Sequence, residues 1–161
     1  MLSRLRPHIL LFLFGLGALA ALTGCESGSG QPITVPAAAQ NALRQKFGTH
    51  LEQLRWHPDS NRLHASFIWK TIPVDVWLTA AGQVQETQLA MLGEDIPPGL
   101  QDSLQRYYRS YQRRAMHLVE TPAGFHYNLL LAAPGGPAMR FRFLADGHRL
   151  SQPVKVSSSP R

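Results

Sequence analysis

Residues 62–78, R-L-H-A-S-F-I-W-K-T-I-P-V-D-V-W-L, decide the fold, because they contain two runs in which polar and apolar side chains alternate. Successive side chains of a strand point to opposite faces of its sheet, so each run predicts a strand with one buried face. The opposite positions, among them His64, Asp75 and Trp77, are expected to face water. The positions expected in the core are Leu63, Ala65, Phe67, Trp69, Ile72, Val74, Val76 and Leu78.

A helical pattern precedes these two strands. Val35-Pro36-Ala37 opens it, and proline suits the first position of a helix. Ala39, Leu43 and Phe47 recur every four residues and predict one apolar stripe, which Gly48 ends. A helix with so narrow a stripe must lie against a partner surface, and the apolar side of the strands supplies it.

The same order of elements recurs along the chain. Ile96-Pro97-Pro98 follows Val35-Pro36-Ala37 by 61 residues, and residues 144–149 follow residues 79–84 by 65. A second helical stripe and two more alternating strands follow the second proline. The apolar positions of this second copy are Leu100, Leu104, Tyr107, Tyr108, Tyr111, Phe125, Tyr127, Leu129, Leu131, Met139, Phe141 and Phe143.

Turn signals separate the strands. Asp146-Gly147 is a two-residue hairpin signal, and residues 58–61 and 121–124 fit four-residue turns. The sequence therefore predicts an α+β protein with two tandem units, residues 35–90 and 96–156. Each unit is expected to be a helix on four antiparallel strands, and the two join in one sheet with both helices on one face.

The order of a V/I-P helix, apolar strands and a hairpin with glycine, repeated in tandem, resembles the PepSY-like family of bacterial secreted proteins. That family is similar in fold to the β-lactamase inhibitor protein (BLIP). The resemblance covers roughly residues 33–156, and it implies no catalytic residues. This chain departs from the family in lacking its Lys/Glu-rich strands.

The N-terminal segment predicts export. Arg4 and Arg6 precede an apolar run that ends in Leu22-Thr23-Gly24-Cys25, which resembles the lipobox of bacterial lipoproteins. The resemblance implies removal of residues 1–24 and acylation of Cys25, so that the chain is held on a lipid bilayer. Glu26, in place of the usual inner-membrane retention residue Asp, points to the outer membrane, with the domain facing the periplasm. An ordinary secretory signal with an incidental cysteine is the alternative.

Residues 25–34 are expected to combine the lipidated cysteine with a flexible tether, since they contain S-G-S-G-Q. Residues 157–161 are expected to be a disordered tail. The 161 residues carry a net charge of +6, which falls to +4 when Arg4 and Arg6 leave with the signal peptide. This charge is too small and too scattered to predict nucleic-acid binding.

The sequence contains no pattern that favours catalysis, a cofactor or a metal. If residues 58–61 form a turn, His57 pairs with Arg62 and Arg55 with His64, which makes the two histidines diagonal neighbours. The same pairing logic brings His117 close to His126. Two ligands per hairpin are too few for zinc, which needs three or four protein ligands.

Candidate catalytic groups are equally weak. Ser66 and Ser103 lack a glycine-rich elbow, and the adjacent carboxylates Glu94 and Asp95 fall in a connector before the second helix. The sequence therefore predicts a protein that is not an enzyme. A second cationic group, Arg106, Arg109, Arg113 and Arg114 around three tyrosines, is expected to be a solvated helix face or to contact anionic lipid.

The polar face of the predicted sheet is the best candidate for a binding surface, because arginine and tryptophan are enriched at binding hot spots. A solvated face that keeps the protein soluble is the alternative. The expected partner is an envelope protein or an anionic envelope component. Two alternative functions remain: the protein is a structural accessory of an envelope complex that adds strands at its sheet edge, or it inhibits a periplasmic hydrolase. The candidate binding residues are Arg55, His57, Arg62, His64, Trp77, His117, His126, Arg140 and Arg142, together with Asn128.

Overall fold

The computed structural model describes residues 34–91, 93 and 95–156. The predicted signal peptide, Cys25, nearly all of the tether and the C-terminal tail lie outside these residues. In the described ranges no helix combines the length and the hydrophobicity that crossing a bilayer requires.

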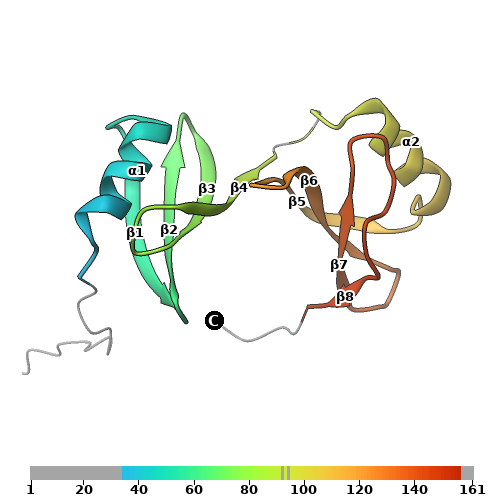
Figure 1. The fold of residues 1–161 in the computed structure, drawn as a ribbon. Helices are drawn as coiled ribbons and strands as arrows, with labels where there is room; N and C mark the ends of the chain where they lie inside the picture. Colours follow the sequence, from blue (N-terminus) through green and yellow to red (C-terminus); the bar gives the residue numbers. More distant parts are fainter. Residues whose placement is uncertain (1–33, 92, 94, 157–161) are drawn as a thin grey trace, which may run out of the picture. The chain divides into compact units, whose positions relative to one another are not determined.

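The chain forms an α+β fold with one antiparallel sheet (Figure 1). Its eight strands lie in the sheet in chain order, and each neighbouring pair is antiparallel. The predicted fold class is confirmed at this level. The elements are α1 (Ala37–Phe47), β1 (Glu52–Asp59), β2 (Arg62–Trp69), β3 (Ile72–Leu78), β4 (Val84–Ala90), α2 (Pro98–Tyr107), β5 (Gln112–Thr121), β6 (Gly124–Ala132), β7 (Ala138–Phe143) and β8 (Val154–Lys155).

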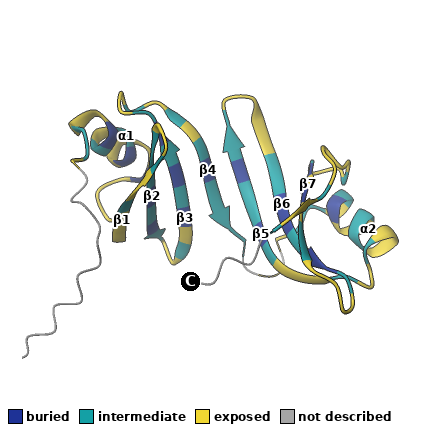
Figure 2. Cartoon of the chain, turned by 90° about the horizontal axis from the view of Figure 1, so that it is seen from below, coloured by how far each residue is buried: buried dark blue, intermediate teal, exposed yellow. Residues whose placement is uncertain are grey.

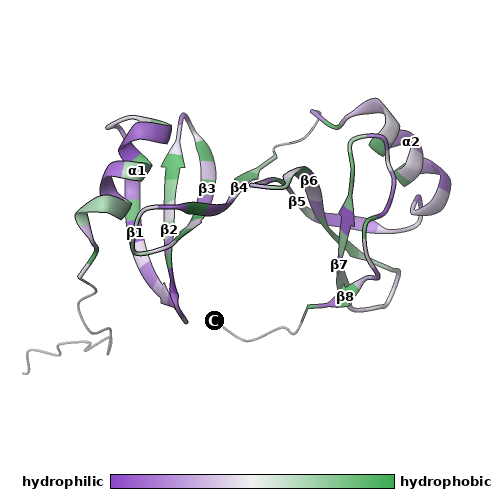
Figure 3. Ribbon diagram, in the orientation of Figure 1, coloured by the Kyte–Doolittle hydropathy of each residue, from purple (hydrophilic) through white to green (hydrophobic). Residues whose placement is uncertain are grey.

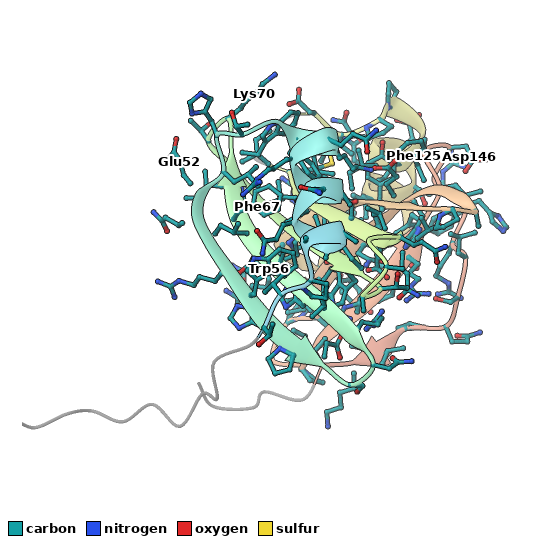
Figure 4. All side chains as sticks on the ribbon, turned by 60° about the vertical axis from the view of Figure 1, so that its left-hand side comes forward. Glu52, Trp56, Phe67, Lys70, Phe125 and Asp146 are labelled. Carbon is teal, nitrogen blue, oxygen red and sulfur yellow. The ribbon has the colours of Figure 1, made fainter. Side chains whose placement is uncertain are left out.

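Helix α1 begins and ends where the sequence predicts. Pro36 precedes its first residue, and Gly48 ends it with φ 85° while its N–H donates to the carbonyl of Arg44 at 2.8 Å. Leu43 and Phe47 pack on Phe67 of β2 and the valines of β3. Figure 4 shows Phe67 and Trp56 on the side of the strands next to α1.

A second hydrophobic cluster lies under α2. Leu100 packs with Leu129 and Leu131 of β6 and with Phe141 and Phe143 of β7. Leu89 of the first cluster pairs with Leu118, and Leu118 pairs with Tyr127 of the second cluster. Directly paired residues lie on the same face of a sheet, so the two clusters share one face. Both helices therefore cover one face. Figure 2 shows buried residues on both helices and on the central strands.

The hairpin after β3 and the hairpin after β7 pack against the two helices in the same way. The N–H of Gly82 donates to Thr79 and the N–H of Gly147 donates to Leu144, at 2.9 and 3.0 Å. A Cβ at Gly82 would lie 2.6 Å from the carbonyl oxygen of Ala38, and one at Gly147 would lie 2.4 Å from that of Gly99. Both glycines also have positive φ, so each turn requires glycine for conformation and for space.

The turn predicted at residues 58–61 is misplaced. The hairpin between β1 and β2 closes through residues 60–61, so β1 extends to Asp59. As a result, Arg62 pairs with Asp59, and the predicted His57–Arg62 pairing is shifted by two positions. A two-residue shift keeps every side chain on its predicted face, because the side-chain period of a strand is two. The turn predicted at residues 121–124 has the expected register, since Glu120 pairs with Phe125.

Three aromatic residues are more exposed than the sequence predicts. Tyr107, expected in the core, is 66% exposed, because helix α2 ends there and turns this side chain outward. Phe125 is 62% exposed because it lies next to the tight turn between β5 and β6. Trp69 is only half-buried, and its indole N–H donates to the carbonyl of Phe47 at 2.9 Å. Phe67, by contrast, is buried as predicted.

Candidate binding surface

The sheet face that neither helix covers, called the open face below, carries all the candidate binding residues. The register places His57, His64, Trp77 and Glu86 in one row across β1–β4. A neighbouring row begins at Arg55 and ends at His126. Figure 3 shows hydrophobic residues concentrated along β2 and β3, with hydrophilic residues on α1.

Three aromatic rings lie in a row along β1, β2 and β3, and two of them are stacked. The imidazole of His64 is stacked on the indole of Trp77 with ring centroids 4.6 Å apart and planes 3° apart. The ring of His57 lies 5.2 Å from that of His64, because these residues are directly paired across the first hairpin. The guanidinium of Arg62 lies over Trp77 at 6.0 Å, at the outer limit for a cation–π contact.

Polar contacts hold this aromatic row in place. His64 Nε2 lies 2.7 Å from Asp75 Oδ1, and His57 Nε2 lies 3.3 Å from Ser66 Oγ. Arg62 donates to Asp59 at 2.5 Å, so part of its charge is already paired. The row is therefore a preorganised aromatic surface with a modest net charge.

The other half of the open face is more cationic. His117, Asn128 and Arg142 form one row across β5, β6 and β7, and Arg140 lies one row away. Arg140 and Arg142 are exposed, and in the part of the chain that the structure describes neither forms a salt bridge. These two guanidinium groups are free to meet an acidic ligand.

Both histidines in this half resist protonation. Burial lowers the pKa of His117, and Arg140 lowers it further against the opposing pull of Asp75. Burial and the charge of Arg142 lower the pKa of His126, although Glu86 and the neighbouring side chain of Asn128 oppose them. The side-chain atoms His126 Nε2 and Asn128 Oδ1 are buried without a hydrogen-bond partner.

Strand β4 contributes residues that the sequence analysis missed. Glu86 opposes Trp77, and Gln88 opposes Asp75 on one side and Val119 on the other. Gln88 Nε2 donates to Glu86 Oε1 at 2.5 Å. Asp75 is therefore not the only acid on the face. The alternation of V-Q-E-T-Q-L-A was the available signal, but it is faint because the buried member is Thr87.

The residues considered for chemistry are not brought together. Among the described residues no group of three or more His, Cys, Asp or Glu side chains has the geometry of a metal site. His57 adjoins His64, while His117 pairs with Asn128 and His126 pairs with Val119, so the second two are diagonal neighbours. Asp95 is exposed, and Glu94 lies outside the described residues.

The second cationic group lies away from the open face. Arg106, Arg109, Arg113 and Arg114 are all exposed, and the guanidinium of Arg106 lies 6.0 Å from the ring of Tyr107. Arg113 donates to the carbonyl of Gly93 at 3.3 Å. Tyr108 and Tyr111 pack against the second hydrophobic cluster, as expected.

Comparison with known proteins identifies the fold. No protein-family model matches the sequence, and no curated protein matches it significantly. Solved structures do match. A protein described as periplasmic from Bacteroides eggerthii is 16% identical with a TM-score of 0.71, over 79% of this chain and 94% of its own. A DUF2874 family protein from Bacteroides uniformis is 17% identical with a TM-score of 0.71, over the same shares.

A BLIP-like protein from Bacteroides fragilis is 15% identical with a TM-score of 0.70, over 81% of this chain and 94% of its own. At these identities the likeness concerns the backbone and not the side chains of any site. The likeness to BLIP in fold that the sequence implied is confirmed. The described chain therefore has the BLIP-like α+β fold of these Bacteroides proteins.

Proposed function

We propose that the protein is a non-enzymatic binding module of the bacterial cell envelope, and that the open face receives its partner. The single observation that carries this proposal is that one uncovered sheet face holds both the aromatic row of His57, His64 and Trp77 on β1–β3 and, on β7, two exposed arginines, Arg140 and Arg142, that form no salt bridge within the described residues. Tryptophan and arginine concentrate the free energy of binding at interfaces. A face that served only solubility would gain nothing from a stacked tryptophan.

The fold likeness supports a binding role. The similar structures include one described as BLIP-like and one described as periplasmic, and a periplasmic location agrees with the predicted export signal. An inhibitor of a periplasmic hydrolase is one form that such binding can take. Fold alone is weak evidence for a partner, so the side chains of the open face carry the argument.

We also propose that the domain arose as two tandem units, residues 35–90 and 96–156. The support is that Gly82 packs on Ala38 as Gly147 packs on Gly99. Ala38 and Gly99 each lie two residues after the proline that precedes their helix, and the two turns form the same hydrogen bonds. A PepSY-like origin would account for this correspondence.

The lipobox supports a location. We propose that Cys25 carries lipid and anchors the protein to the outer membrane, with the domain in the periplasm. Two or three acyl chains would make this attachment effectively irreversible, since each buried methylene contributes about 0.8 kcal/mol. The tether would then let the open face reach a partner.

A structural accessory is the second candidate function. Among the described strands β1 pairs with β2 alone, so its other edge offers backbone groups to which a partner strand can pair. Such a partner would tolerate changes at Trp77 and Arg140, because main-chain hydrogen bonds would hold it. Proline at a β1 edge position, such as Arg55→Pro, would abolish this mode and is its test.

The experiment that tests the proposed function is capture of a partner from detergent-solubilised envelope by the tagged full chain. Three forms should be compared: wild type, Trp77→Ala, and the double variant Arg140→Glu with Arg142→Glu. A matched control, Arg106→Glu with Arg109→Glu, reverses the same charge on exposed arginines off the open face. The proposal expects a stoichiometric partner that both open-face variants lose and the control keeps. Equal capture by all forms would overturn it.

A further inference from the structure

A small pocket lies in the open face over β4–β7. Its volume is about 90 Å³, and six of the residues that line it are Gln88, His117, Asn128, Leu130, Arg140 and Val156. One water molecule occupies about 30 Å³ of the liquid, so the pocket can hold the tip of one side chain but not a nucleotide or a sugar. The small volume restricts the part of a ligand that the pocket encloses to a few heavy atoms.

The lining of the pocket is mixed, with the apolar Ala115, Leu129, Leu130 and Val156 beside polar side chains, and one buried polar atom in it is unsatisfied. Asn128 is only 6% exposed, and its Oδ1 has no hydrogen-bond partner. His126 Nε2, two residues earlier on the same face of β6, is likewise buried and unpartnered. Burial of unpaired polar atoms costs free energy, and a ligand that pairs with them recovers part of it.

The charge around the pocket selects an anion. Arg140 borders it, Arg142 opposes Asn128 across β6–β7, and in the described part of the chain no carboxylate forms a salt bridge with either. The acids whose charges act on these histidines are Asp75 and Glu86 on β3 and β4: Asp75 raises the pKa of His117 more than Arg140 lowers it, and Glu86 raises the pKa of His126. Asp75 is already engaged by His64.

The groups fit a carboxylate better than a larger anion. A guanidinium binds a carboxylate through two parallel hydrogen bonds, and one cation at the rim matches one negative charge. Because no donor holds Asn128 Oδ1, the amide can rotate to present its NH₂ group without losing a hydrogen bond. An imidazole N–H of His117 offers a further donor. A phosphate group, which is larger and more strongly charged, lacks the second bordering cation that it favours.

We propose that this pocket, Arg140 over Asn128 and His117, binds the carboxylate of an aspartate or glutamate side chain that the partner inserts into the open face. This inference rests on the proposed function, since it specifies how the partner is recognised. The same carboxylate chemistry would also admit a free small carboxylic acid. The test must therefore separate the two sources.

The pocket is tested first on its own, with sodium acetate as the probe. Histidine side-chain NMR signals of the full chain in detergent micelles report binding, and sodium sulfate at equal ionic strength is the reference salt. We expect saturable shifts of His117 and His126 with acetate only. Arg140→Gln should weaken the affinity about tenfold, the factor expected for losing a hydrogen bond to a charged group.

Two further variants complete this part of the test. Arg109→Gln removes the same charge from an exposed site off the open face, so acetate affinity should stay within about twofold. Asn128→Asp preserves shape and places a negative charge in the pocket, so it should abolish the shifts; if it fails to fold, Arg140→Gln decides alone. The pocket assignment is overturned if acetate gives no saturable shift, if sulfate gives the same shift, or if Arg109→Gln weakens binding as much as Arg140→Gln.

Partner capture then identifies the source of the carboxylate. If capture from the envelope is lost in Arg140→Gln and kept in Arg109→Gln, a side chain of the partner fills the pocket. If acetate binds but Arg140→Gln captures the partner normally, the pocket serves a free carboxylic acid and the proposal is wrong. If acetate does not bind but Trp77→Ala still abolishes capture, the inference fails while the proposed function stands.

Discussion

The indole of Trp77 and the imidazole of His64 lie in nearly parallel planes, 3° apart, with their centres 4.6 Å apart. Direct pairing of these residues across β2 and β3 brings the rings together. Asp75 holds the histidine from one side through a contact of 2.7 Å. The stack fixes an aromatic side chain in one orientation on an uncovered face, which reduces the entropy that a partner must remove on binding.

This stack should be measurable as a coupling free energy. His64→Ala and Trp77→Ala, alone and together, form a double-mutant cycle for the free energy of unfolding in urea. We expect a favourable coupling of roughly 0.5–1.5 kcal/mol, the range for aromatic pairs beyond their burial. The cycle formed with Arg55→Ala in place of His64→Ala is the control. Additive effects of His64→Ala and Trp77→Ala would mean that the rings do not stabilise one another.

Phe141 should be among the most costly residues to truncate. It is 2% exposed and packs between Tyr108, Tyr111 and Phe143, so Phe141→Ala should lower the free energy of unfolding by roughly 3–5 kcal/mol. Phe125→Ala removes the same ring from a site that is 62% exposed, and should cost under about 1 kcal/mol. Chemical denaturation measures both, and similar costs would contradict the described core.

The hairpin glycines should be intolerant of a methyl group for a reason beyond their backbone angle. Gly147 and Gly135 both have positive φ, but only Gly147 has atoms of the helix within 3 Å of the missing Cβ. Gly135→Ala should cost roughly 1–2 kcal/mol from the left-handed conformation alone. Gly147→Ala should cost about 1–3 kcal/mol more, because the helix must move. Thermal unfolding compares them, and equal losses would argue against the close packing.

Acid should destabilise the protein through His117 and His126. Burial and neighbouring arginines lower the pKa of both in the folded state, so the unfolded chain binds more protons. Their contribution to stability is complete above the ordinary histidine pKa of about 6.5 and is lost as pH falls through the lower folded-state pKa. Denaturation at pH 7.5, 6.5, 5.5 and 4.5 should show this loss. In the double variant His117→Gln, His126→Gln, the free energy of unfolding should change less between pH 7.5 and pH 5.5 than in the wild type. An unchanged pH dependence would mean that other groups cause the loss of stability.

The anchor is testable without the folded domain. Cys25→Ser removes the acceptor of the lipid, so we expect an unprocessed chain that no longer fractionates with the outer membrane. Gel mobility and membrane fractionation measure both effects. Glu26→Asp, which restores the usual inner-membrane residue, should instead move the protein to the inner membrane. A Ser variant that migrates and fractionates like wild type would contradict lipidation.

The sequence predicted face assignments better than register. Alternation places His64 and Trp77 on the correct face at any even shift of the strands, so the misplaced turn at residues 58–61 left that assignment intact. The length of the turn depends on the local backbone conformation. Ser60 adopts φ 54°, and the sequence did not predict this because serine rarely has a positive φ. The direct His57–His64 pair was therefore predicted only as a diagonal one.

The pocket in the open face could not be predicted from the sequence. It depends on how β4 aligns with β5, because that alignment brings Gln88 beside His117 and the residues of β6 and β7. Pairing between strands separated by a helix follows from tertiary packing, which local patterns do not encode. The open-face position of the buried Asn128 was predictable by alternation, but its burial was not.

The two hydrophobic clusters share one sheet but no residue, and β4 and β5 join them through four residue pairs, Thr87–Ala90 with His117–Glu120. Each cluster has its own helix, so opening one need not expose the other. Such an arrangement favours sub-global unfolding, in which one half exchanges its amide hydrogens while the other stays protected. The pocket proposed to bind a carboxylate is lined by residues of β4, β5, β6 and β7. A ligand that contacts β4 together with β5 and β7 would link the two halves, which would then unfold as one cooperative unit.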